Sequence, residues 1–244
     1  MKKLVVAVLA LGLVGCSTPA PETTPAPEST LSGTVNVFAA ASLTGSFQEI
    51  ADAFTAENPD VEIVFNFGGS SGLATQIVEG APADVFAAAS PATMEASGAT
   101  DTQDFATNVL EIAVAKGNPG DIQGLDDFAN PDKLIALCAV EVPCGAAADK
   151  LLTEAGITPS VDTYEQDVKA VLTKVELGEV DAGLVYVTDV LDAGDAIEGI
   201  EVDSTPVKYP IATLTDNEAA AAFVAFVLSA KGQAILKAAG FGTP

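Results

Sequence analysis

Apolar runs of strand length alternate with segments of helical periodicity over the first half of the chain. The runs VNVFAAA at 35–41, VEIVFNF at 61–67 and ADVFAAA at 83–89 are separated by predicted helices that end near Ala56 and near Glu79. Runs that are apolar throughout, rather than alternating, are typical of strands covered on both faces. The pattern therefore predicts parallel strands joined by right-handed helical crossovers, which is a doubly wound α/β lobe.

A second α/β series follows the first. It contains the strand-like runs NVLEIAVAKG at 108–117, LIALCAV and AGLVYV, with predicted helices from about Ala146 to Ala155 and from about Val168. The strand YPIATL and the helices within 217–239 are expected to return to the first lobe. We thus expect lobe 1 from 34–110 and 206–244 and lobe 2 from 111–205, joined by two crossings that form a hinge.

The N-terminus reads as a targeting signal. Lys2 and Lys3 precede an apolar run from Leu4 to Val14, and the segment LVGC ends at Cys16. This resembles a bacterial lipobox, which implies that residues 1–16 are a lipoprotein signal peptide and that Cys16 is lipidated. The alternative is a core helix that happens to end in Cys. Residues 17–33, rich in Pro, Ser, Thr and Glu, are predicted to form a flexible tether.

The charge balance and the absence of His exclude several classes of function. The chain has 34 acidic and 10 basic residues, none of them Arg, and no His. Nucleic acid and anionic lipid surfaces are disfavoured because both need clustered cations. The absence of His removes the commonest general base and the commonest ligand of transition metals, so most hydrolase and metalloenzyme classes are excluded. After loss of Lys2 and Lys3, the mature net charge would be −26.

Two cysteines remain after the signal segment. Cys138 and Cys144 stand in LCAVEVPCG, and an exported location makes a disulfide between them favourable. Such a bridge would fix the backbone around Pro143 to Gly145, ahead of a helix. The alternative is a pair of buried free thiols.

Two helix starts in the predicted lobe 1 carry hydroxyl groups. Ser42 stands at a strand-to-helix junction, where Ser46 and Glu49 form a possible capping box that would leave the Ser42 hydroxyl free. Ser70 and Ser71 lie in FGGSSG at 67–72, where glycines permit close backbone approach and a helix dipole favours an anion. Ordinary turn serines remain the alternative at each position.

Two helix starts and one strand end in the predicted lobe 2 complete the candidate set. The third helix follows VPCG, and the fourth begins at Val168 after Asp167, which is expected to cap it and point its carboxylate away from any anion. Tyr186 ends a strand, where open α/β sheets place ligands. Core-facing helix ends and a half-buried aromatic are the structural alternatives.

The segments VFAAASL, FGGSSGLATQIVEGAPADVF, EVPCG, EQDV and GLVYVTD, in this order and spacing, resemble the bacterial molybdate-binding proteins of ABC transporters. The similarity covers nearly all of residues 34–244. It implies an α/β, two-lobed periplasmic-binding-protein fold in which each lobe is a mostly parallel sheet flanked by helices. It also implies that the ligand is bound by the hydroxyls and amides of Ser42 and Ser70, the amides of Cys144 and Val168, and the hydroxyl of Tyr186. The role of Ser71, next to Ser70, stays open.

The resemblance implies an extracytoplasmic, lipid-anchored monomer that captures molybdate, and also tungstate, for an ABC permease with a cytoplasmic ATPase. No cofactor, metal cation or enzymatic activity is expected. Molybdate carries no proton at neutral pH, so a pocket of hydroxyl and amide donors suits it. The open alternatives are a binder of sulfate or thiosulfate, a cation-binding homologue, a serine hydrolase using Ser42 or Ser70, and a surface adhesin.

Overall fold

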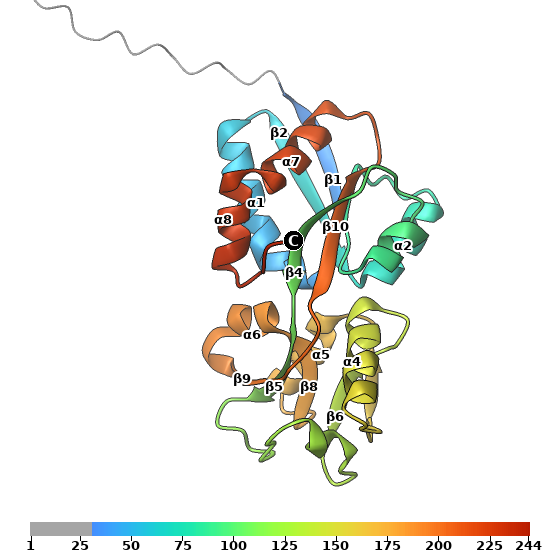
Figure 1. The fold of residues 1–244 in the computed structure, drawn as a ribbon. Helices are drawn as coiled ribbons and strands as arrows, with labels where there is room; N and C mark the ends of the chain where they lie inside the picture. The colour runs from blue at the N-terminus through green and yellow to red at the C-terminus, as the bar shows by residue number, and fades with distance from the viewer. Residues whose placement is uncertain (1–30) are drawn as a thin grey trace, which may run out of the picture.

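The computed structural model describes residues 31–244, and these residues form two lobes (Figure 1). The predicted signal peptide, Cys16 and the predicted tether as far as residue 30 lie outside the described residues. The last part of the expected tether belongs to lobe 1, because Leu31 packs against its core and the first strand begins at Gly33.

Lobe 1 is built on a five-stranded sheet with the order β2-β1-β3-β10-β4. Its strands are β1 (Gly33–Ala40), β2 (Val61–Gly68), β3 (Val85–Ala87), β4 (Gln103–Asn108) and β10 (Val207–Thr213). Its helices are α1 (Thr44–Glu57), α2 (Ser70–Val78), α3 (Pro91–Ala96), α7 (Glu218–Leu228) and α8 (Ala230–Ala238). The core is aromatic where α1 meets α7, since Phe47 and Phe54 both make edge contacts with the Phe223 ring.

Lobe 2 repeats the architecture with the sheet order β7-β6-β8-β5-β9. Its strands are β5 (Leu110–Ala115), β6 (Ile135–Cys138), β7 (Thr163–Glu165), β8 (Ala182–Tyr186) and β9 (Ile197–Glu201). Its helices are α4 (Pro143–Glu154), α5 (Val168–Glu176) and α6 (Val187–Ala193). Aliphatic side chains such as Val171, Val175 and Leu184 fill its separate core.

Each sheet is mostly parallel, as predicted, but contains one strand that runs against its neighbours. These strands are β5 and β10, the first strand of each lobe that the chain enters after crossing from the other lobe. A strand entering from the boundary runs away from it, whereas the parallel strands run towards it. The carboxyl ends of the parallel strands of both lobes therefore face the boundary, where β4, β5 and β10 pass (Figure 1).

Two local predictions were wrong. Ser46 and Glu49 form no capping box, because a 3-10 turn at Ala41–Leu43 runs directly into α1; Ser46 lies inside the helix and its hydroxyl donates to the Leu43 carbonyl at 3.2 Å. Helix α4 begins at Pro143 rather than near Ala146. Proline needs no acceptor for a backbone N–H and has a helical φ, so it suits the first turn.

Within residues 31–244, no single helix has the length and apolar composition needed to cross a membrane. Helices α7 and α8 meet that test only as a pair, which is bent by 60°.

Candidate functional site

The five residues of the expected ligand set line one small cavity of about 20 Å³ between the lobes. Lobe 1 contributes the ends of β1 and β2 with the helical starts that follow them, and lobe 2 contributes the starts of α4 and α5 and the end of β8. The cavity is lined by Ala40, Ala41, Ser42, Gly68, Gly69, Ser70, Ala89, Val142, Pro143, Cys144, Asp167, Val168 and Tyr186. No Lys is among these residues, so the lining carries no cation.

Both lobe-1 serines are buried and hydrogen-bonded through their oxygens. Ser42 lies in the 3-10 turn after β1, and its Oγ is 2.9 Å from the phenol oxygen of Tyr209. Ser70 is the first residue of α2, and its Oγ accepts from the backbone N–H of Ala89 at 3.0 Å. Because that oxygen is already an acceptor, the hydroxyl hydrogen of Ser70 is left to donate elsewhere.

Cys144 lies in the first turn of α4, where backbone N–H groups have no acceptor within the helix. The structure joins it to Cys138 at the end of β6 in a disulfide, with the two Cα atoms 5.7 Å apart. Gly145 follows, and a Cβ there would lie 1.8 Å from the Ala139 carbonyl oxygen. The disulfide and the glycine together hold the start of α4 against the end of β6.

Val168 opens α5, and Asp167 is its N-cap. The Asp167 carboxylate accepts from the amide of Ala170 at 2.9 Å. The cap therefore uses a later amide of the first turn and leaves that of Val168. The expected conflict between the Asp167 charge and a bound anion is eased, because this carboxylate is engaged with its own helix.

Tyr186 carries a buried polar atom that the protein leaves unsatisfied. Its phenol oxygen has no hydrogen-bond partner among the described residues, although buried hydroxyls normally have one. Burial, with the neighbouring Tyr209 adding to it, raises the pKa of the Tyr186 phenol well above its usual range. The group is therefore a neutral donor that lines the cavity and lacks an acceptor.

A buried ion pair supports the backbone at Tyr186. Asp189 accepts from the Tyr186 amide at 3.1 Å and lies 3.3 Å from the Lys169 ammonium, which also pairs with Asp192 at 2.7 Å. Burial raises the pKa of the Asp189 carboxyl to about 6, while Lys169 lowers it. Lys169 is thus committed to carboxylates and is not one of the cavity residues.

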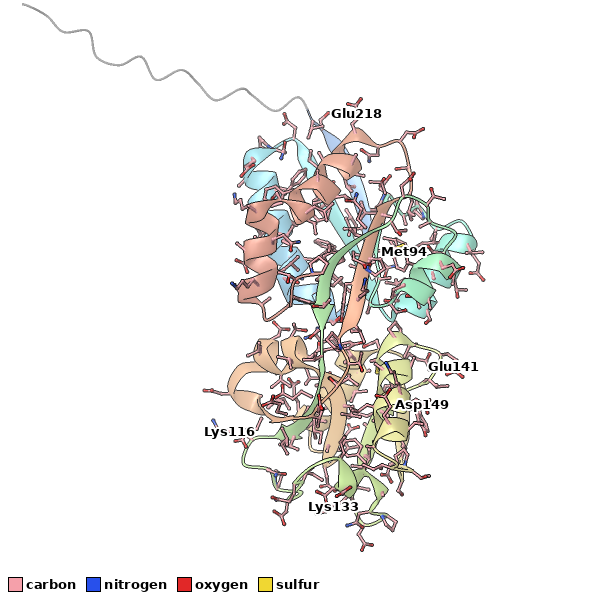
Figure 2. The ribbon with its side chains drawn as sticks, viewed as in Figure 1. Met94, Lys116, Lys133, Glu141, Asp149 and Glu218 are labelled. Carbon is pink, nitrogen blue, oxygen red and sulfur yellow. A yellow bond between two sulfur atoms is a disulfide. The ribbon has the colours of Figure 1, made fainter. Side chains whose placement is uncertain are left out.

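Ser71, whose role the sequence leaves open, does not line this cavity. Its hydroxyl donates across the boundary to the Glu141 carbonyl oxygen at 2.6 Å. Figure 2 places Glu141 on the lobe-2 side of that boundary. Gly69 also reaches lobe 2, since a Cβ there would lie 2.2 Å from the Gln166 carbonyl oxygen. The structure therefore holds the lobes in close contact around the cavity.

Sequence reasoning missed two buried polar residues that lie next to the site, Tyr209 and Asn108. Tyr209 on β10 contacts Ser42, from which it is 167 residues distant in sequence, and Asn108 at the end of β4 contacts Tyr209. Tyr209 belongs to the YPIATL run, which predicted a strand. A contact across that sequence distance leaves no periodicity or spacing that could reveal it.

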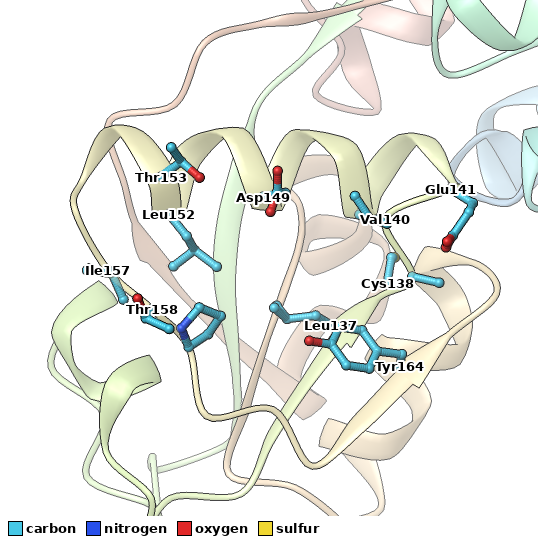
Figure 3. Close-up of a pocket in the computed structure, with 13 residues that line it drawn as sticks. Leu137, Cys138, Val140, Glu141, Asp149, Leu152, Thr153, Ile157, Thr158 and Tyr164 are labelled. Carbon is cyan, nitrogen blue, oxygen red and sulfur yellow. The ribbon is translucent and has the colours of Figure 1, made fainter.

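A larger cavity, of about 630 Å³, lies on lobe 2 beside α4 (Figure 3). Leu137, Leu152 and Ile157 supply apolar surface there, while Glu141 and Asp149 supply negative charge. Carboxylates disfavour an anion, so this cavity lacks the chemistry of the smaller one. Among residues 31–244, no group of three or more Cys, Asp and Glu is placed to hold a metal ion.

The chain is similar to known proteins in both sequence and fold. A family model described as bacterial extracellular solute-binding protein matches residues 35–242. The molybdate-binding protein ModA of Mycobacterium tuberculosis is 40% identical to the chain, covering 99% of it and 97% of the relative. ModA of Escherichia coli is 32% identical, covering 86% and 89%. The solved periplasmic molybdate-binding protein of Azotobacter vinelandii has the same fold, with a TM-score of 0.75 at 24% identity, covering 86% of this chain and 99% of its own.

Proposed function

Because the chain belongs to the bacterial extracellular solute-binding proteins and resembles their molybdate-binding members over its full length, we propose that it captures molybdate between its lobes. The ligand would be held by Ser42, Ser70, Cys144, Val168 and Tyr186. The observation that carries this proposal is the cavity in which these residues from both lobes meet, with an unsatisfied phenol and no cationic side chain.

The donor set favours an oxyanion without protons. Serine and tyrosine hydroxyls and helix-terminal amides donate hydrogen bonds, and molybdate and tungstate accept through every oxygen. Hydrogen phosphate would also need an acceptor. The one carboxylate in the lining, that of Asp167, is the N-cap of α5 and accepts from the Ala170 amide through Oδ1, whereas the five residues of the expected ligand set offer donors. The site therefore supports tungstate as a second ligand and disfavours hydrogen phosphate.

Binding does not require a basic side chain. Hydrogen bonds to a charged group contribute roughly 1.5–3 kcal/mol each, and a helix N-terminus contributes roughly 0.3–1 kcal/mol. Several such contacts can offset the cost of removing the anion from water and give micromolar affinity or better. The acidic surface opposes approach only within a screening length of about 8 Å at physiological salt.

The remaining steps are suggested by the two-crossing architecture, the N-terminal sequence and, for the permease and its ATPase, the resemblance to molybdate-binding proteins of ABC transporters. We propose that the lobes open and close about the crossings, and that the closed protein delivers its anion to a membrane permease driven by a cytoplasmic ATPase. Cys16 would be the lipid anchor at the extracytoplasmic face, and the protein would act as a monomer. Metabolic labelling with a fatty-acid analogue that is lost in Cys16→Ala would support the anchor, whereas retained labelling would exclude it.

Calorimetric titration of the purified protein with molybdate, tungstate, sulfate and phosphate tests the ligand. We expect tight binding of the first two anions and weaker binding of phosphate, because hydrogen phosphate brings a proton to a pocket of donors; the sulfate titration measures how far the site discriminates by size. Tight sulfate binding without a response to molybdate would replace the substrate and retain the site.

Serine substitutions test the position of the site. Ser42→Ala and Ser70→Ala should each weaken molybdate binding by about tenfold or more, because each removes a donor to a charged ligand. Ser46→Ala is the matched control, since Ser46 is buried in the same segment and bonds only to Leu43. Affinity unchanged in both test variants would show that the anion binds elsewhere.

A further inference from the structure

For each of the two cavity serines, Ser42 and Ser70, the direction of the hydroxyl hydrogen decides whether the group can donate to a ligand. A hydroxyl can rotate, so it serves as an obligate donor to a ligand only if another group already donates to its oxygen. For Ser70 that group is the backbone N–H of Ala89. For Ser42 the partner is Tyr209, and the 2.9 Å contact between the two hydroxyls does not by itself show which one donates.

The surrounding network fixes the direction. Asn108 is buried at the end of β4, and its Oδ1 accepts from the Val109 N–H at 3.0 Å. Its Nδ2 therefore faces Thr188 Oγ1 at 2.8 Å and the Tyr209 phenol oxygen at 3.5 Å. An amide nitrogen can only donate, so Tyr209 is the acceptor in this long contact.

Only one acceptor remains for the Tyr209 hydrogen. The phenol oxygen of Tyr186, the other phenol beside it, lies outside hydrogen-bonding geometry with any partner among the described residues, whereas Ser42 Oγ is only 2.9 Å from the Tyr209 oxygen, so the hydrogen of Tyr209 is directed to Ser42. Burial raises the pKa of the Tyr209 phenol, which keeps that hydrogen in place. The Ser42 hydroxyl makes no other hydrogen bond within residues 31–244, and its own hydrogen is left for the cavity that it lines.

We infer that Tyr209 is a positioning residue for anion capture, which orients the Ser42 hydroxyl as an obligate donor through a one-way chain from Asn108 to Tyr209 to Ser42. This inference rests on the proposed function. The chain begins where β4 leaves lobe 1, and Tyr209 lies on β10, the strand that returns to it. The strands that cross between the lobes therefore also carry the residues that orient the Ser42 hydroxyl.

A double-mutant cycle tests this role. Tyr209→Phe keeps the ring and its packing against Phe105 and Phe241, but removes the hydroxyl. We expect molybdate binding about tenfold weaker in the single variant. In a Ser42→Ala background the same substitution should have almost no further effect, because Tyr209 acts through Ser42. In a Ser70→Ala background, the matched control, it should keep its full effect.

The outcomes separate the two proposals. Equal losses from Tyr209→Phe in the Ser42→Ala and Ser70→Ala backgrounds would overturn the positioning role while leaving the binding function intact. If the unaltered protein binds none of molybdate, tungstate and sulfate, the proposed function fails and the positioning role fails with it. Thermal unfolding followed by circular dichroism verifies that each variant folds, and Tyr164→Phe, an exposed tyrosine of lobe 2, controls for loss of a phenol.

Discussion

At the scale of single residues, the cavity contains a buried hydroxyl that destabilises the folded protein. A buried polar group without a partner costs about 1–3 kcal/mol, and the Tyr186 hydroxyl is in that position among the described residues. A phenylalanine would fit the same space without the cost. Under the proposed function, the hydroxyl serves the ligand rather than the fold.

Tyr186→Phe should separate stability from binding. We expect the free energy of unfolding without ligand to stay the same or rise by up to about 1 kcal/mol, because the unsatisfied donor is gone. Molybdate affinity should fall by about tenfold to a hundredfold, because the charged ligand loses a donor. Denaturant unfolding and calorimetry measure the two quantities. A variant that loses stability and keeps its affinity would show that the hydroxyl serves the fold.

The sequence revealed some of these residues and not others, for a physical reason. Ser42, Ser70 and Tyr186 stand at strand ends and helix starts, where chain direction alone brings groups to one edge of a sheet. Tyr209 and Asn108 act behind the cavity through contacts across long sequence distances. Such contacts depend on which strands become neighbours, and that is settled only when the lobes assemble.

At the scale of elements, the N-terminal ends of three helices supply the backbone amides that line the site. The starts of α2, α4 and α5 all line the cavity. A different residue stands at each start: Gly69 is the N-cap of α2, Pro143 is the first residue of α4, and Asp167 is the N-cap of α5. The apolar periodicity predicted that these helices exist. It placed α4 about three residues late because a proline in a turn-like segment does not show whether a helix has already begun.

The disulfide should matter for both stability and binding. Replacing Cys138 and Cys144 together by alanine is expected to lower the free energy of unfolding by about 2 kcal/mol, on the chain-entropy model for so short a loop. Molybdate binding should weaken severalfold, because the start of α4 is held less firmly. Treating the unaltered protein with a reductant should reproduce both effects. The double variant, which has no disulfide, is the control and should not respond to the reductant. Binding unchanged after verified reduction would show that α4 is positioned without the bridge.

At the scale of the whole molecule, the two-lobed plan could be predicted and the contact between lobes could not. Alternating strands and helices predicted two α/β units joined by two crossings, and both sheets are mostly parallel as expected. The reversed strands β5 and β10 were not predicted, because strand direction leaves little trace in composition. The close approach of Gly69 to Gln166 depends on how the two lobes assemble and has no local sequence signal.

Gly69→Ala should hold the lobes apart. The backbone at Gly69 has φ −62°, which alanine adopts without strain, but its Cβ would lie 2.2 Å from the Gln166 carbonyl oxygen in lobe 2. The clash exists only when the lobes meet. We therefore expect unfolding without ligand to be unchanged, molybdate affinity to fall by about tenfold or more, and the radius of gyration by X-ray scattering to stay larger at saturating ligand.

The matched control for this prediction is Gly72→Ala, in the helix that Gly69 caps. A Cβ there has no heavy atom within 4 Å, so affinity and radius should match those of the unaltered protein. A Gly69→Ala protein that binds and compacts normally would mean that lobe contact at this point is not needed for capture.

The disulfide at the start of α4 also bears on how such a site can change over generations. Under the proposed function, positions 144 and 168 serve the anion through the main chain, so selection on binding constrains their side chains only in size and in the need for a backbone N–H. Cys144 has used that freedom for a covalent bond to Cys138. Substitutions at these two positions can therefore accumulate for reasons of stability alone, and a descendant with different side chains there would keep the ancestral ligand.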